Sequence, residues 1–186
     1  GWLRRKRLRR AGAYFESPAL VGCCLAISRK LYKRLRGFDR YMAEWGVEDL
    51  DLGLKAWLLG HSILNDPHAV IGHRFRDAFA SFSVAPESVL VNEIRAARKN
   101  FSEPVWNDWL RRFRARHPRK LFDAAWKVYR RGASSAERER EYLLAHRVRD
   151  EFGYARRFRL GWPTRPGGRS PRPSGGLVAG ARRRKA

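Results

Sequence analysis

The chain has 186 residues, of which 44% are hydrophobic and 12% aromatic, so it can build one modest core and at most a small second unit. Its formal charge is +23, which predicts a cationic surface that attracts phosphates, anionic lipid headgroups and nucleic acid at low salt. No apolar run reaches the roughly 20 residues of a membrane-spanning helix, and the two adjacent cysteines form neither a zinc set nor a CxxC redox pair.

The first segment, residues 1–15, is a basic lead-in with little apolar patterning. It lacks the apolar stretch of a secretory signal and does not begin with methionine, so we interpret this end as a cut within a longer protein. The low cysteine content suits a reducing compartment. We therefore expect a cytoplasmic location, with membrane association if the basic ends contact an anionic surface.

Strands are expected in the second segment, residues 16–85. The apolar run Leu20–Ile27 has the composition of a buried strand and includes both cysteines. Ser62–Leu64 and Ala69–Ile71 are shorter strand candidates. Strands that alternate with helices predict an α/β layer.

Two helices are expected between these strands. Ser28 is placed to cap a helix that runs through Leu35 and is closed by Gly37. Glu48–Leu59 has apolar residues at helical spacing, and Gly60 follows as a stop.

The third segment, residues 86–160, is predicted to be a helical extension. Pro86 suits the first position of a helix that ends near Asn100. Further helices are expected from Glu103, over Pro118–Tyr129 and over Ser134–Phe152, the last opening on a sequence close to a capping box. Residues 161–186 are rich in Pro, Gly, Ser and Arg, which predicts a disordered basic tail.

Two neighbouring carboxylates, Glu48 and Asp49, stand at the predicted start of a helix, directly after Trp45 and Gly46. The helix dipole favours negative charge there. A carboxylate beside an aromatic face suits the binding of sugar hydroxyls and the removal of a proton from one of them. The alternative is that the two acidic residues only start the helix.

These residues belong to a longer run of motifs that resembles the second half of the catalytic domain of family 2 glycosyltransferases. The shared motifs are Gly37-Phe38-Asp39, Glu48-Asp49-Leu50-Asp51-Leu52, Gly60 and His73. W-G-x-E-D at Trp45–Asp49, G-H-R-F-R at Gly72–Arg76 and the small-residue run Ser17–Ile27 are similar to the galactosyl- and N-acetylgalactosaminyltransferase branch, and Asn92–Ala96 resembles it faintly. The resemblance implies the second half of a GT-A, Rossmann-like α/β domain, followed by the helical extension and the tail.

The resemblance also implies roles for individual residues. Asp49 would be the general base of an inverting transfer, and Glu48 would bind hydroxyls of the donor or acceptor sugar. Trp45 would form a wall against the sugar, together with Gly46.

Three further residues receive roles in the same way. Gly22 and Arg76 would lie against the substrate. His73 would be the distal ligand of Mn²⁺ (or Mg²⁺), which also requires an upstream Asp-x-Asp or Asp-x-His motif that this chain lacks.

The other acidic and histidine residues are expected to have structural roles. Asp39 and Asp51 would cap or pair with basic neighbours, and Asp49 and Asp51 would point in different directions from one helix. Asp66-Pro67-His68 is a weaker metal candidate in a variable turn. The remaining histidines are expected at the surface or at helix caps: His61, His68, His117 and His146.

The resemblance thus implies a fragment of a hexosyl- or N-acetylhexosaminyltransferase of polysaccharide biosynthesis, using a UDP-sugar donor and a saccharide or glycoconjugate acceptor. Without the nucleotide-binding half, the isolated chain is expected to be inactive. One alternative is a module that binds a polyanion, either nucleic acid or an anionic membrane surface, although no scaffold for specific nucleic-acid binding is present. Another is a scaffold role in which the helical extension contacts a partner.

Overall fold

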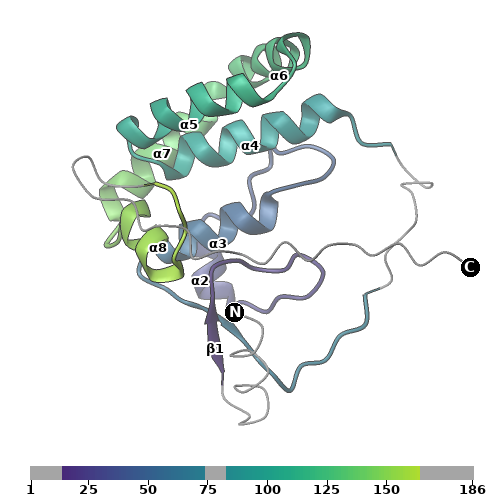
Figure 1. Ribbon diagram of the computed structural model, residues 1–186. Helices are drawn as coiled ribbons and strands as arrows, with labels where there is room; N and C mark the ends of the chain where they lie inside the picture. The colour runs from purple at the N-terminus through teal and green to yellow at the C-terminus, as the bar shows by residue number, and fades with distance from the viewer. Residues whose placement is uncertain (1–13, 74–82, 164–186) are drawn as a thin grey trace, which may run out of the picture.

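A computed structural model describes residues 14–73 and 83–163 of the chain (Figure 1). Within these residues the fold is mixed α/β, with seven helices and one two-stranded sheet. The order is β1 (Phe15–Ser17), α2 (Arg29–Arg34), α3 (Glu48–Leu58), β2 (Ile63–Asn65), α4 (Pro86–Asn100), α5 (Glu103–Arg116), α6 (Arg119–Arg131), α7 (Ala133–His146) and α8 (Glu151–Phe158). The predicted α/β class is confirmed, while most of the predicted tail lies outside the described residues.

The sheet consists of β1 and β2, which run antiparallel with Phe15 opposite Asn65. The strand predicted at Ser62–Leu64 is confirmed, one residue further along. The strands predicted at Leu20–Ile27 and Ala69–Ile71 are wrong, because neither segment has strand structure. A strand needs a neighbouring backbone for its hydrogen bonds, and within the described residues β1 and β2 pair only with each other.

The segment around the two cysteines forms a turn instead of a buried strand. The Cys24 backbone N–H donates to the Val21 carbonyl at 3.1 Å. Cys23 and Cys24 are both exposed and free, so the expectation that they are buried is wrong.

Helices α2 and α3 begin and end as predicted. The Ser28 hydroxyl accepts from the Leu31 backbone N–H at 3.2 Å, which caps α2. Gly37 and Gly60 follow the two helices at φ +65° and +91°, the left-handed region that glycine enters most easily.

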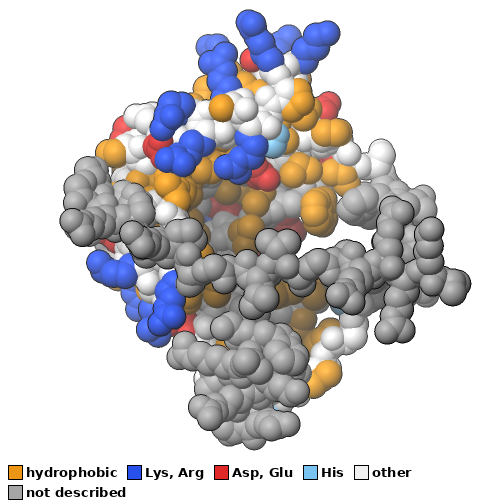
Figure 2. All heavy atoms as spheres, viewed as in Figure 1, with side chains coloured by type: hydrophobic (Ala, Val, Ile, Leu, Met, Phe, Trp, Pro, Cys, Tyr) orange, Lys and Arg blue, Asp and Glu red, His pale blue; other side chains and the backbone are white. Residues whose placement is uncertain are grey.

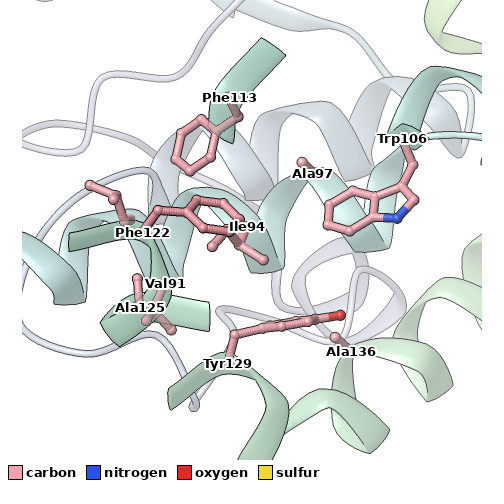
Figure 3. Close-up of a cluster of buried hydrophobic side chains, with 10 residues drawn as sticks. Val91, Ile94, Ala97, Trp106, Phe113, Phe122, Ala125, Tyr129 and Ala136 are labelled. Atoms are coloured by element: carbon pink, nitrogen blue, oxygen red, sulfur yellow. The ribbon is translucent and has the colours of Figure 1, made fainter. Parts of the chain in front are cut away.

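Helix α4 lies at the centre of the helical part of the molecule, where it packs against α6, α7, α3 and α5. Figure 1 shows α4 to α7 as a layer over α3. One face of α4 contributes Leu90, Val91, Ile94 and Ala97 to a cluster of buried apolar side chains. Figure 3 shows Ile94 among the rings of Phe113, Phe122 and Tyr129, so aromatic residues from α5 and α6 close this core.

The single helix predicted over Ser134–Phe152 is wrong, because two helices occupy this range. The break follows from contacts with α3: the backbone N–H groups of Val148 and Arg149 donate to the Leu58 carbonyl at 2.9 and 3.2 Å. Asp150 then caps α8 by accepting from the Gly153 N–H at 2.6 Å. The capping box expected at Ser134 does not form, since α7 already begins at Ala133.

Candidate active site

The two predicted catalytic carboxylates, Glu48 and Asp49, occupy the first two positions of α3. The helix dipole supports negative charge at this end. Trp45 lies just before them with 51% of its surface exposed. The structure therefore brings an exposed aromatic side chain and two carboxylates together at the start of one helix.

The loop that leads into α3, residues 43–47, has an unusual backbone. Glu44, Gly46 and Val47 all have positive φ, at +57°, +110° and +63°. For a β-branched residue such as Val47 this conformation is costly, by about 1–3 kcal/mol, and persists only where surrounding contacts impose it. Strain of this kind often accompanies functional sites.

Asn92 of α4 supplies most of the contacts that hold this loop. Its Oδ1 accepts from the Ala43 N–H at 3.0 Å, and its Nδ2 lies 2.9 Å from the Ala43 carbonyl oxygen. The same Nδ2 lies 3.3 Å from the Trp45 carbonyl oxygen and 3.2 Å from that of Gly46. Because Asn92 is only 1% exposed, these contacts are shielded from water and fix the loop against α4.

Two further hydrogen bonds close the loop. Glu44 Oε2 accepts from the Ala85 N–H at 2.6 Å, just before α4 begins. Glu48 Oε2 accepts from the Gly46 N–H at 3.0 Å, which leaves its other carboxylate oxygen available for a substrate hydroxyl.

Asp49 contacts Gly22 of the turn that replaces the predicted strand. Its Oδ2 accepts from the Gly22 N–H at 2.9 Å, and its Oδ1 accepts from the Leu50 N–H at 2.7 Å. A Cβ atom at position 22 would lie 3.2 Å from Asp49 Oδ2, so glycine permits this close approach. A carboxylate offers about four acceptor sites, so Asp49 keeps capacity to accept a proton from a bound hydroxyl.

The predictions for Asp39 and Asp51 are confirmed, because both form ion pairs with α4. Arg95 donates to both oxygens of Asp39, at 2.9 and 3.0 Å, and Lys99 Nζ lies 2.8 Å from Asp39 Oδ2. Lys99 Nζ also lies 2.8 Å from Asp51 Oδ2, and Asn100 donates to Asp51 Oδ1 at 2.7 Å. Asp51 thus points into the α3–α4 interface while Asp49 faces Gly22, as predicted for two residues that differ in direction.

Burial and neighbouring charges shift the pKa values of Asp39 and Lys55 in this network. Burial alone would raise the pKa of Asp39, but the charge and hydrogen bond of Lys99, with help from Arg95, lower that pKa below its ordinary value. Burial lowers the pKa of Lys55, and the nearby Asp51 carboxylate offsets only part of this effect. The Lys55 ammonium donates to the Gly37 carbonyl at 2.6 Å, so the network also holds the turn after α2.

A complete metal centre is not formed by the described residues. They contain no group of three or more His, Cys, Asp or Glu side chains able to hold a metal ion. His73 is exposed and stands outside any helix or strand, so this part of the chain offers at most one ligand at the predicted position. Arg76 lies outside the described residues.

The contacts of the other histidines are with residues other than Glu48 and Asp49. His68 Nδ1 is 3.2 Å from Asp66 Oδ1 in an exposed turn, and His146 Nδ1 contacts the Tyr142 carbonyl oxygen at 2.8 Å near the end of α7. His117 packs against the Phe113 ring. His61 is half-buried, and its Nε2 has no hydrogen-bond partner within the described residues.

Comparison with known proteins connects this site to a family. A family model described as the N-terminal domain of galactosyltransferase matches residues 5–76. This range contains every predicted site residue. Helices α4 to α8 lie outside it, so the match covers the loop and carboxylates but not the Asn92 side of the site.

The following three relatives are named as polypeptide N-acetylgalactosaminyltransferases. The chain is 40% identical over 62 residues to polypeptide N-acetylgalactosaminyltransferase 8 of Drosophila melanogaster, covering 33% of the chain and 10% of the relative. Polypeptide N-acetylgalactosaminyltransferase 11 of Xenopus tropicalis is 36% identical over 64 residues, covering 34% of the chain and 11% of the relative. Polypeptide N-acetylgalactosaminyltransferase 10 of Homo sapiens is 34% identical over 62 residues, covering 33% of the chain and 10% of the relative. The chain spans a fifth or less of the length of the curated relatives it matches. The alternative of a polyanion-binding module has no support from these matches.

Proposed function

We propose that the chain, whose residues 5–76 match the galactosyltransferase family model and are similar to polypeptide N-acetylgalactosaminyltransferases, supplies the general base and acceptor side of a sugar transferase of the GT-A fold. The donor is a UDP-sugar that carries a hexosyl or N-acetylhexosaminyl group. The acceptor is a saccharide or glycoconjugate of polysaccharide biosynthesis. The observation that carries the proposal is the pair Glu48 and Asp49 at the start of α3, beside the exposed Trp45 and behind a fixed loop.

In this proposal Asp49 acts as the base. It takes the proton of the acceptor hydroxyl while the hydroxyl oxygen attacks the anomeric carbon. The bond from that carbon to the UDP oxygen breaks, UDP leaves with the bonding electrons, and the configuration at the anomeric carbon inverts. Asp49 suits this role because Gly22 and Leu50 fix its orientation and leave acceptor capacity on both oxygens.

Glu48 and Trp45 position the sugar. The free carboxylate oxygen of Glu48 accepts a hydrogen bond from a sugar hydroxyl, and the Trp45 ring packs against the apolar face of the sugar. Gly46 allows the substrate close to the backbone, and Arg76 contributes a positive charge to the same side. We further propose that His73 is one ligand of a Mn²⁺ or Mg²⁺ ion, whose other ligands come from residues outside the described ranges.

We assign the reaction to the cytoplasm. The two cysteines are free and exposed, which suits a reducing compartment. Fractionation of cells that express the full-length protein tests this location.

The test of the proposed function is Asp49→Asn in the full-length polypeptide that contains this segment, assayed with UDP-N-acetylgalactosamine and UDP-galactose. General-base catalysis contributes about 10²–10⁴-fold, so kcat is expected to fall at least about 100-fold while KM for the donor changes little. Asp66→Asn, which removes an exposed carboxylate from the same segment, is the matched control and keeps wild-type kcat. A kcat for Asp49→Asn within threefold of the wild type would refute the role of Asp49, and retention of the anomeric configuration in the product would refute inversion.

A further inference from the structure

A cationic cavity lies between the end of α3 and helix α8. Its volume is about 900 Å³ and it opens to solvent. Trp57, ten residues into α3, forms part of its wall, so the cavity lies at the opposite end of this helix from Asp49. Blue side chains gather at the left of Figure 2, where Figure 1 places α8.

Five arginines line this cavity, and three of them are held in place by other groups. The Arg149 guanidinium lies 4.3 Å from the centre of the Trp57 ring and donates to the His61 carbonyl at 3.1 Å. Arg147 donates to the buried Glu151 at 3.2 Å, and Arg157 donates to Glu16 at 2.6 Å. A guanidinium has five N–H donors, so each of these side chains is oriented and still has donors for a ligand.

The other two arginines, Arg156 and Arg159, have no such anchor. Within residues 14–73 and 83–163, neither side chain forms an ion pair or a hydrogen bond. Both are exposed at the rim of the cavity. A ligand can therefore bind them without breaking an ion pair or a hydrogen bond to another described residue.

The charges around the cavity do not cancel. Five guanidinium groups face three carboxylates, those of Glu16, Asp150 and Glu151, which leaves two positive charges in excess. Burial would raise the pKa of Glu16, but its hydrogen bonds from Ser62 and Arg157 lower that pKa below its ordinary value, so this carboxylate stays charged at neutral pH. The excess matches a phosphate group, which carries about −1.5 to −2 at pH 7.

We infer that the cavity between α3 and α8 binds a phosphate-bearing ligand through Arg156 and Arg159, with Arg147, Arg149 and Arg157 as fixed donors around it. Planar guanidinium groups bind both phosphate and carboxylate in bidentate pairs. The excess of two positive charges favours phosphate over a singly charged carboxylate or halide. The site is separate from the Glu48–Asp49 pair and does not depend on the proposed transferase activity. The phosphate group can belong to a soluble diphosphate or to a lipid headgroup.

The experiment compares two double variants of the full chain that lose the same charge. Arg156→Ala/Arg159→Ala alters the cavity, while Arg130→Ala/Arg131→Ala removes two exposed arginines from the end of α6. Pyrophosphate is titrated by calorimetry in EDTA at about 0.15 M salt, where long-range attraction is screened. Vesicles of phosphatidylcholine with and without phosphatidic acid form the second arm, and circular dichroism verifies that both variants fold.

The wild type and the α6 variant are expected to bind pyrophosphate saturably with similar affinity, whereas the cavity variant binds at least about tenfold more weakly, since two charge-assisted contacts are lost. If the wild type and the α6 variant bind phosphatidic acid vesicles more tightly than the cavity variant does, and none of them binds pyrophosphate, the site is assigned to a lipid headgroup. Absence of saturable binding in both arms, or equal weakening in the two variants, overturns the inference.

Discussion

Asn92 connects the helical extension to the site loop through a single buried side chain. Its amide contacts the backbone at Ala43, Trp45 and Gly46, and it lies 49 residues after Ala43 in the sequence. These contacts hold the loop in a conformation with three positive φ values, which brings Trp45 next to Glu48 and Asp49. The geometry of the proposed site therefore depends on one residue that belongs to neither the loop nor α3.

Asn92→Ala is expected to release this loop. The Ala43 N–H and three carbonyl groups lose their partner, so the free energy of unfolding should fall by about 2–4 kcal/mol, and amide exchange at Ala43 should become faster. Hydrogen exchange followed by mass spectrometry measures the second effect, and urea unfolding the first. Asn107→Ala, at an exposed position of α5, is the control. Unchanged protection at Ala43 in the Asn92 variant would contradict the positioning role.

The sequence located Trp45, Glu48 and Asp49 because they stand close together in motifs. It did not reveal the role of Asn92, for which the faint resemblance of Asn92–Ala96 was the only sign. The amide acts across a long sequence separation, and neither spacing nor periodicity reports such a contact. The strand predicted around Gly22 is also wrong, because Gly22 contacts Asp49 from a turn.

Helix α4 has two faces with different chemistry. One face packs apolar side chains against α6 and α7, and the other presents Asn92, Arg95 and Lys99 to the loop and α3. The apolar spacing predicted the first face. The second could not be predicted, because an arginine and a lysine in a helix usually point to solvent, and their burial here depends on Asp39 and Asp51 from distant elements.

The Asp39 network makes stability depend on pH. The folded-state pKa of Asp39 lies below the ordinary value of 3.8, so the unfolded chain binds more protons than the folded chain near that pH. The Asp39 carboxylate therefore stabilises the fold above about pH 4, and this contribution is lost as the pH falls through the folded-state pKa. Unfolding by urea between pH 2.5 and 6 is expected to show this decline in the wild type and in Asp66→Asn. Asp39→Asn should be less stable at pH 6 by about 3 kcal/mol, since Arg95 and Lys99 lose a buried partner, and its stability should decline less towards pH 3. Parallel curves for Asp39→Asn and the wild type would exclude this account.

At the scale of the whole molecule, the described residues form a helical layer joined to a thin α/β part. The alternation of helices and strands was predictable from apolar spacing, capping residues and glycines, and most helix bounds agree with the prediction. The sequence predicts more strands than the described residues form, because a composition typical of a buried strand does not specify the strand with which it would pair. The break between α7 and α8 was missed because it depends on hydrogen bonds to Leu58 of α3.

The two parts are expected to unfold together, since buried ion pairs and the Asn92 contacts cross between them. Ile94→Ala removes a side chain with no exposed surface from the helical core and should reduce the free energy of unfolding by about 2–5 kcal/mol. Far-ultraviolet circular dichroism, to which the helical layer contributes most, and pulsed hydrogen exchange of the α3 backbone followed by mass spectrometry should report the same shifted urea midpoint. Leu144→Ala, at a position 38% exposed on α7, should shift the midpoint much less. Separate midpoints for the two probes would show that the parts unfold independently.

The long separation between Asn92 and the loop it holds also has a consequence for biosynthesis. Residues 43–47 leave the ribosome well before α4, so the strained backbone around Val47 lacks its hydrogen bonds to Asn92 and Ala85 until those residues have been made. Helix α3 can form earlier, because its hydrogen bonds are local. Glu48 and Asp49 therefore acquire their final surroundings only when the chain has been synthesised through α4. Nascent chains released before that point contain every predicted site residue without the arrangement that the proposed site requires.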